Sequence, residues 1–192
     1  MNNIKDIRLA ALLMIIAAGS RFIPHMPNFT PTEGMTLLGT AYLGRKYWAM
    51  ILPILMLIIS DFILNNTVAR SYFPDQEGIV WFAPYMIFNI LSIITIVLIC
   101  KKILSKISVT SVMGSALIAS VVFFLITNFG SWIDNVIPYS KDISGLLSSY
   151  TAALPFFRTS LLSNVIFTGI LFGSFEIIKS IETKRRTAIS KI

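Results

Sequence analysis

"RFIPHMPNFTPTEG", residues 21–34, separates two apolar stretches of a 192-residue chain and holds three of its eight prolines and its one histidine. Residues that precede proline avoid helical backbone, so Pro24 and Pro27 predict an extended corner. Residues 30–33 have the pattern of a capping box, with Pro31 at the first helical position. The stretch therefore predicts the end of one helix, a corner and the start of a second helix.

The second helix is expected to be short. Gly44, Arg45 and Lys46 are predicted to end it near Leu43, so that about 13 residues at about 1.5 Å each make a helix of roughly 20 Å. The apolar core of a bilayer is roughly 30 Å thick and needs about 20 helical residues. We therefore expect this helix to tilt little, to thin the membrane locally, or to begin below the surface in a cavity.

The composition is that of an integral membrane protein. Hydrophobic residues make up 55% of the chain, the mean hydropathy is +0.78, and the 13% of charged residues is about half the usual share. The net charge of +7 raises the possibility of a nucleic-acid partner. However, the basic residues form short clusters between apolar runs and the aromatic residues lie inside the runs, as the positive-inside bias of membrane proteins predicts. No nucleic-acid partner is expected.

Five further apolar runs are long enough to cross a membrane. The first run is superficially similar to a signal peptide, but no A-x-A cleavage site follows it, so we expect it to be retained as a span. The predicted fold is an all-α integral membrane protein, a six-helix transmembrane bundle with a short second helix. Its single domain covers residues 1–180, and a basic cytoplasmic tail covers residues 181–192. The expected spans are residues 7–23, 31–44, 47–64, 79–100, 111–132 and 161–178.

The distribution of basic residues predicts the orientation. Six spans with a cytoplasmic N-terminus place twelve Lys and Arg inside and four outside, whereas five spans with an outer N-terminus place eleven inside and five outside. The second arrangement puts Lys5 and Arg8 on the wrong side. With six spans the outer connections are long: residues 21–34, then 65–78, then a loop of almost thirty residues between Ile133 and Ser160 that includes a possible short helix. Long outer loops on a small bundle are typical of functional or lid-like segments.

Polar groups in or near the spans are the candidates for function, because they are costly to bury in a membrane. Asp61, with Asn65, either ends its helix at the headgroups, or pairs with Arg21 or Arg158, or receives a polar group of a substrate. Buried amides such as Asn164 usually bond to a neighbouring helix. The candidate substrate-binding residues are Arg21, His25, Asn28, Phe29, Asp61, Asn89, Asn128, Trp132, Tyr150, Phe156 and Arg158.

Catalytic and metal-binding patterns are not found in the sequence. One histidine, His25, and one cysteine, Cys100, are too few for a closed metal site. The chain has no catalytic triad, no H-E-x-x-H, no phosphate-binding glycine loop and no paired carboxylates at a useful spacing. We therefore expect neither an enzyme nor a cofactor, although an intramembrane enzyme or a proton-coupled carrier that uses Asp61 is a further alternative.

Several motifs together resemble a known family. They are R-F-I-P-H-x-P-N-F-T-P at residues 21–31, L-G-x-A-Y-L-G-R at 38–45, S-D at 60–61, T-N-F-G-x-W at 127–132 and Y-x-A-A-L-P-F-F-R at 150–158. Over about residues 7–178 the chain resembles an uncharacterised bacterial membrane family whose members are described only as transport proteins. That family is similar to the S (substrate-binding) components of energy-coupling-factor vitamin transporters.

The resemblance implies a fold, a location and a function. S components are six-helix proteins of the bacterial inner (cytoplasmic) membrane, so the implied arrangement is multi-pass with both termini cytoplasmic. The implied function is uptake of a small micronutrient or vitamin-like molecule from a cavity covered by outer loops. An ATPase-bearing partner would supply energy and dock on the first span through Ala10, Ala11, Ala17 and Ala18.

The alternative function is a non-transporting membrane scaffold of envelope assembly. The two functions predict different arrangements of the outer polar residues. A transporter predicts that they converge on one outward cavity with aromatic residues above it, and a scaffold predicts that they scatter among separate caps and salt bridges. The residues that decide are Arg21, His25, Asn28, Asp61, Asn128 and Arg158.

Overall fold

The computed structural model describes residues 4–43, 46–134 and 137–189. Within these residues the chain forms six α-helices and two short 3₁₀ helices, and it contains no strand, so the predicted all-α class is confirmed. The elements are α1 (Ile4–Gly19), η1 (Ser20–Phe22), α2 (Thr32–Tyr42), α3 (Lys46–Asn65), η2 (Arg70–Tyr72), α4 (Tyr85–Ile103), α5 (Val109–Ile133) and α6 (Ile143–Ile189).

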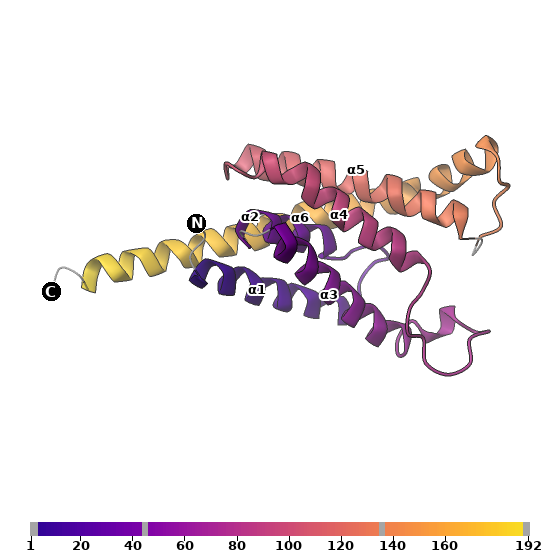
Figure 1. Cartoon of the computed structure of the whole chain (residues 1–192), viewed down its shortest axis with the longest axis horizontal. Helices are drawn as coiled ribbons and strands as arrows, with labels where there is room; N and C mark the ends of the chain where they lie inside the picture. Colours follow the sequence, from indigo (N-terminus) through magenta and orange to yellow (C-terminus); the bar gives the residue numbers. More distant parts are fainter. Residues whose placement is uncertain (1–3, 44–45, 135–136, 190–192) are drawn as a thin grey trace.

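The helices run back and forth along one axis (Figure 1). The connections after α1, α3 and α5 lie at one end of the bundle, which we call the loop end; it comprises residues 20–31, 66–84 and 137–142. The start of α1, the turn between α4 and α5 and the end of α6 lie towards the opposite end, which we call the terminal end. The extended corner predicted from the opening stretch therefore belongs to the loop end.

Four helices are long and apolar enough to cross a membrane: residues Tyr47–Asn65, Tyr85–Ile103, Val109–Ile133 and Ile143–Ala188, in α3 to α6. Their outward faces carry large apolar side chains, such as Ile59 at 58% exposure and Leu98 at 52%. Exposed apolar surface on this scale is unfavourable in water and favourable against lipid. These helices indicate a membrane protein. The helices α1 and α2 have 16 and 11 residues and fall short of that length.

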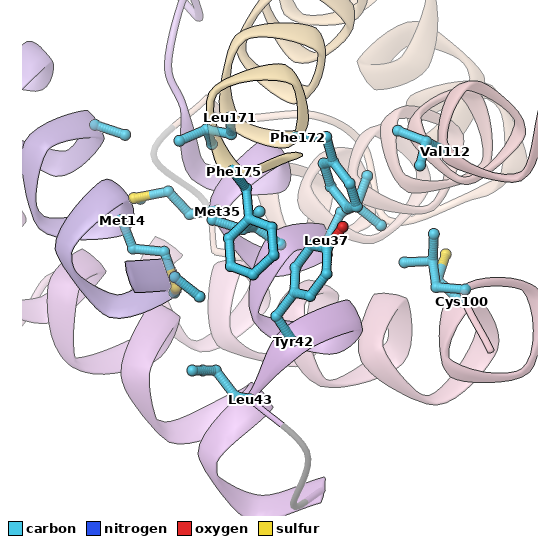
Figure 2. Packing of buried hydrophobic residues seen from close by; sticks show 14 of the residues in the cluster. Met14, Met35, Leu37, Tyr42, Leu43, Cys100, Val112, Leu171, Phe172 and Phe175 are labelled. Atoms are coloured by element: carbon cyan, nitrogen blue, oxygen red, sulfur yellow. The ribbon is translucent and has the colours of Figure 1, made fainter. Parts of the chain in front are cut away.

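The short helix α2 lies at the centre of the bundle. It contacts all five other α-helices, and its residues from Thr32 to Gly39 are buried on every side. Figure 2 shows Met35 and Leu37 among side chains of the neighbouring helices. A helix that is buried all round can be apolar on every face. Because Thr32 and Glu33 are only 2% exposed, α2 begins inside the protein.

Aromatic and ionic contacts close the terminal end around α6. The ring of Tyr42 stacks on Phe175 with 3.7 Å between centroids (Figure 2). Its hydroxyl group donates to Oε1 of Glu176 at 2.6 Å. Nζ of Lys179 lies 3.2 Å from Oδ2 of Asp6. These contacts attach α1 and α2 to the same turn of α6.

The predicted capping box at the start of α2 is wrong. Pro31 occupies the N-cap position and no side chain caps the helix. Instead, Oε1 of Glu33 accepts from Oγ of Ser160 on α6 at 3.2 Å. The carboxyl group of Glu33 is buried inside the protein and faces α6, so it also bonds to that helix.

The predicted start of the 79–100 span is also wrong. The helix α4 begins only at Tyr85, with Pro84 at the N-cap. The preceding segment is held by the side chain of Asn66. Nδ2 of Asn66 donates to the carbonyl of Val80 at 2.9 Å, and Oδ1 of Asn66 accepts from the backbone N–H of Val80 at 2.8 Å. These bonds replace the backbone bonds that a helix would provide.

The last helix is much longer than the predicted span 161–178. The outer loop expected between Ile133 and Ser160 ends at residue 142, and α6 runs unbroken from Ile143 to Ile189 with Pro155 inside it. Oδ1 of Asp142 accepts from the N–H of Gly145 at 2.8 Å and so caps the start of α6. The predicted tail is therefore helical through Ile189. Residues 190–192 of that tail, and Gly44 and Arg45, lie outside the described residues.

Candidate functional site: a polar cavity at the loop end

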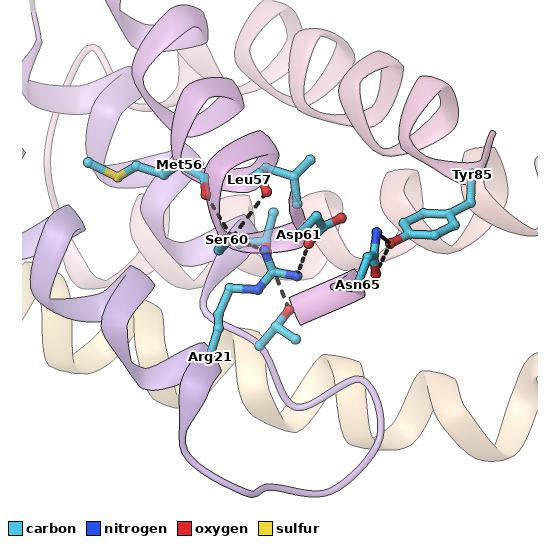
Figure 3. A network of polar contacts seen from close by, with 9 residues as sticks. Arg21, Met56, Leu57, Ser60, Asp61, Asn65 and Tyr85 are labelled. Atoms are coloured by element: carbon cyan, nitrogen blue, oxygen red, sulfur yellow. Dashed lines mark hydrogen bonds and ion pairs between the residues drawn. The ribbon is translucent and has the colours of Figure 1, made fainter. Parts of the chain in front are cut away.

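A buried ion pair joins η1 to α3 at the loop end. Nη2 of Arg21 lies 2.5 Å from Oδ1 of Asp61, and the two side chains are 10% and 3% exposed. Nη1 of Arg21 donates to Oγ of Ser60, which donates in turn to the carbonyl of Met56 at 2.7 Å (Figure 3). The pairing of Arg21 with Asp61 is one of the alternatives predicted from the sequence, and the structure confirms it.

One turn further along α3, Asn65 contacts the start of α4. Nδ2 of Asn65 donates to the hydroxyl oxygen of Tyr85 at 3.0 Å (Figure 3). Residues 61 and 65 are four apart and lie on one helix face. Asp61 and Asn65 therefore present a carboxylate and an amide side by side, towards the space between α3 and α4.

That space is a cavity of about 370 Å³, which we call the first cavity. Its apolar lining is Leu57, Leu64, Ala69 and Phe123. Its polar lining comes from the 21–34 stretch and from α3, α4 and α6, and it consists of Arg21, Asn28, Thr30, Thr32, Asp61, Asn65, Tyr85, Asn89 and Ser160. Polar groups from segments far apart in the sequence thus converge on one space at the loop end.

A second cavity of about 190 Å³ adjoins the first between α5 and α6. The two cavities share Asn28, Phe123 and Ser160. The other lining residues of the second cavity are Phe124, Thr127, Asn128, Ser131, Ala153, Phe156 and Phe157. Asn28, at the junction, has a φ of 61°, a left-handed conformation that asparagine tolerates better than most residues. The sharp turn at Asn28 brings the 21–34 stretch against both cavities.

Residues 1–187 match a family model described as "Family of unknown function (DUF6580)". The chain belongs to this family. No curated protein and no solved structure matches it. Since membership in DUF6580 assigns no activity, any function has to be inferred from the site.

The site of this DUF6580 chain includes six of the eleven residues predicted from the sequence. Arg21, Asn28, Asp61 and Asn89 line the first cavity, and Asn28, Asn128 and Phe156 line the second.

The other five predicted residues lie outside both cavities. His25 and Arg158 are exposed. Phe29 packs on Phe167 with 5.6 Å between ring centroids, Trp132 donates from Nε1 to the carbonyl of Ser140 at 2.8 Å, and Tyr150 donates to the carbonyl of Leu125 at 2.8 Å. Of the six residues that a transporter is expected to bring to one cavity, Arg21, Asn28 and Asp61 line the first cavity, Asn128 lines only the second, and His25 and Arg158 line neither.

Some lining residues in this DUF6580 protein were not predicted. Asn65 was expected only to end its helix, although its spacing from Asp61 could have placed it on the same face. Tyr85 and Ser160 have no such signal, because their position depends on how α4 and α6 pack. Within the described ranges, no group of three His, Cys, Asp or Glu side chains could hold a metal ion.

Two further predictions concern helix contacts. Asn164 bonds across to α5 as expected of a buried amide: its Nδ2 donates to the carbonyl of Ala116 at 2.7 Å and to Oγ of Ser120 at 2.9 Å. Of the four alanines proposed for docking, Ala10 and Ala17 are buried in the core. Ala11 and Ala18 are half-buried, so only these two can contribute to an outer surface of α1.

Proposed function

We propose that this protein is the substrate-binding component of a membrane uptake system for a small polar molecule. The observation that carries the proposal is the first cavity. It combines a buried ion pair, three side-chain amides and several hydroxyl groups around about 370 Å³ of space, and ligand pockets typically occupy about 300 to 1,000 Å³. Burial of polar groups in a membrane protein is costly in free energy, so a cluster of them favours a functional role. Binding of a polar ligand is such a role.

The proposed topology has six membrane-spanning helices in the bacterial inner membrane, with α2 enclosed by the other five. Both termini are cytoplasmic and the loop end faces outward. The support is the charge distribution, because basic residues on cytoplasmic segments outnumber those outside. The segments towards the terminal end, namely α1, the end of α4 with the following turn, and the second half of α6, carry Lys5, Arg8, Lys101, Lys102, Lys106, Lys179, Lys184, Arg185 and Arg186. The loop-end segments carry Arg21, Arg70 and Lys141, and Arg158 lies in the first half of α6.

Energy for uptake is proposed to come from an ATPase-bearing partner, as the similarity to S components implies, since the sequence has no nucleotide-binding motif. The proposed contact is the outward face of α1. Leu12, Ile15 and Ile16 are between 54% and 63% exposed there, and Ala11 and Ala18 flank them.

A scaffold function has less support. A scaffold would need no shared space for Arg21, Asn28, Asp61 and Asn89, which come from different parts of the chain and nevertheless line one cavity.

The test is to identify a molecule that stays bound to the protein. The full chain is purified in a mild detergent and examined by native mass spectrometry, and cellular accumulation of any molecule found is then measured. We expect a bound molecule in the wild type and in His25→Ala, which changes an exposed residue outside both cavities. We expect none in Asn89→Leu, which places an apolar side chain in the first cavity. A wild type that never retains a small molecule, or an Asn89→Leu variant that accumulates it normally, would contradict the proposal.

A further inference from the structure

We infer that the first cavity binds an uncharged small molecule that carries amide or lactam groups, with one carbonyl oxygen directed at Nε of Arg21. This inference rests on the proposed function and adds the chemical class of the ligand. It follows from one unpaired donor, from the balance of charge around the cavity and from the chemistry of the lining.

The unpaired donor is on Arg21. Its two terminal nitrogens are engaged by Asp61 and Ser60. Its Nε, however, is buried without a hydrogen-bond partner. Among the side-chain nitrogen and oxygen atoms of the described residues, only Oγ of Ser115 is also buried without a partner. Arg21 lines the first cavity and its side chain is nine-tenths buried. A buried N–H that lacks an acceptor is unfavourable, so a ligand oxygen in the cavity would complete the hydrogen bonding of the guanidinium group.

The charges around the cavity favour an uncharged ligand. The lining contains one cation, Arg21, and one anion, Asp61, which already neutralise each other. An anionic ligand would compete with Asp61 for Arg21, and it would lie close to the buried Glu33 behind Ser160. A cationic ligand would be placed beside the guanidinium group. Either would leave a buried charge without a full partner, which is strongly unfavourable.

The lining also favours amides over simple alcohols. Asn28, Asn65 and Asn89 line the cavity, and a side-chain amide has both N–H donors and a carbonyl acceptor. The amide of Asn65 already bonds to the hydroxyl group of Tyr85, so the inference depends mainly on Asn28 and Asn89. An amide or lactam offers the complementary acceptor and donor next to each other, so it can bond to an asparagine through two parallel hydrogen bonds. Leu57, Leu64 and Phe123 form an apolar wall. The ligand is therefore expected to have one polar edge and one apolar edge.

The experiment uses three sets of fragments matched in size: uncharged amides and lactams, carboxylates, and amines. Binding to the purified full chain in detergent is measured by thermal stabilisation and then by titration. We expect the binding fragments to be uncharged amides or lactams. We expect Arg21→Lys, which keeps a positive charge for Asp61 but removes Nε–H, to weaken their binding about tenfold, the usual effect of losing one hydrogen bond to a charged group. The matched control is Arg158→Lys, an exposed arginine outside both cavities, which should bind as the wild type does.

Three outcomes would overturn the inference. These are binding mainly by carboxylates or amines, binding of uncharged fragments that Arg21→Lys leaves unchanged, and no binding by any fragment. In the first case a charged ligand that Asn89→Leu excludes would leave the proposed binding function standing and refute only the ligand class. In the third case, if native mass spectrometry also finds no bound molecule, the proposed function fails as well. Should Arg21→Lys not fold, Asn89→Leu provides the binding-deficient variant for all three sets.

Discussion

Removal of one partner of the Arg21–Asp61 pair should destabilise the protein strongly. The Nη2–Oδ1 distance of 2.5 Å places the charge centres about 4 Å apart, which corresponds to about 4 kcal/mol at an effective dielectric constant of about 20. Since the side chains are only 10% and 3% exposed, solvent screens them little. Asp61→Asn leaves the guanidinium group buried without its counter-charge, and such changes cost about 3 to 5 kcal/mol.

The assay is a double-mutant cycle in detergent micelles, with the free energy of unfolding measured by a reversible method such as steric trapping. Arg21→Gln and Asp61→Asn are made singly and together, and the double variant should recover about 2 to 4 kcal/mol relative to the sum of the singles. The control is Asp6→Asn, whose partner Lys179 is 42% exposed; it should cost less than about 1 kcal/mol. A cost of Asp61→Asn similar to that of the control, or additive single effects, would refute the reasoning.

Three further predictions concern helix packing and helix ends. Gly34→Ala should lower the free energy of unfolding by about 1 to 3 kcal/mol, because a Cβ there would lie 3.1 Å from the backbone nitrogen of Thr168 on α6. The control is Gly114→Ala, which has open space at its Cβ and should raise the free energy of unfolding, measured by steric trapping, by up to about 1 kcal/mol. Ser108→Ala removes the capping box of α5 and should cost about 1 kcal/mol, measured by chemical denaturation; no change would show that the cap is unimportant. Hydrogen bonds hold the pKa of Asp142 below its ordinary value of 3.8, so its stabilising effect is fully present above that value and is lost as the pH falls through it towards the lowered pKa. Asp142→Asn should remove this part of the pH dependence of the melting temperature, and an unchanged profile would contradict the assignment.

The sequence was sufficient for those elements that depend on local hydropathy. The apolar run that contains Pro53 became α3, because a proline inside a buried helix is accommodated by neighbouring helices. The short helix after residue 30 could be recognised from its stop signal and its length. Its position at the centre of the bundle could not, since burial on all sides depends on where the five other helices lie.

The errors have tertiary causes. The stretch from Ile143 to Phe157 is predicted as part of an outer loop that includes a possible short helix, yet the whole stretch belongs to α6. It packs against α5: Oγ of Ser149 donates to the carbonyl of Asn128 at 2.8 Å, and the ring centroid of Phe157 lies 4.7 Å from that of Phe124. Such contacts leave no periodic trace in the sequence.

The site shows the same division. Arg21, Asn28, Asp61 and Asn89 could be selected because polar residues in apolar surroundings are rare. His25 was selected for the same reason, and it is exposed. Rarity therefore identifies a candidate, whereas the direction of its side chain depends on the backbone turn that carries it. In the 21–34 stretch, Arg21 faces Asp61 on α3, whereas His25, four residues later, is exposed.

The length of α6 has a mechanical consequence. Its 47 residues make a rod of roughly 70 Å, about twice the thickness of the apolar core of a bilayer. Ser160 forms part of the cavity wall, and Glu176 and Lys179 hold α2 and α1 at the terminal end. Both groups lie on the same uninterrupted stretch after Pro155, and near its middle α6 is in tight contact with Gly34. Ser160 and the two terminal-end contacts therefore belong to one continuous helix, so a displacement of α6 at the cavity would also displace the contacts of Glu176 with Tyr42 and of Lys179 with Asp6.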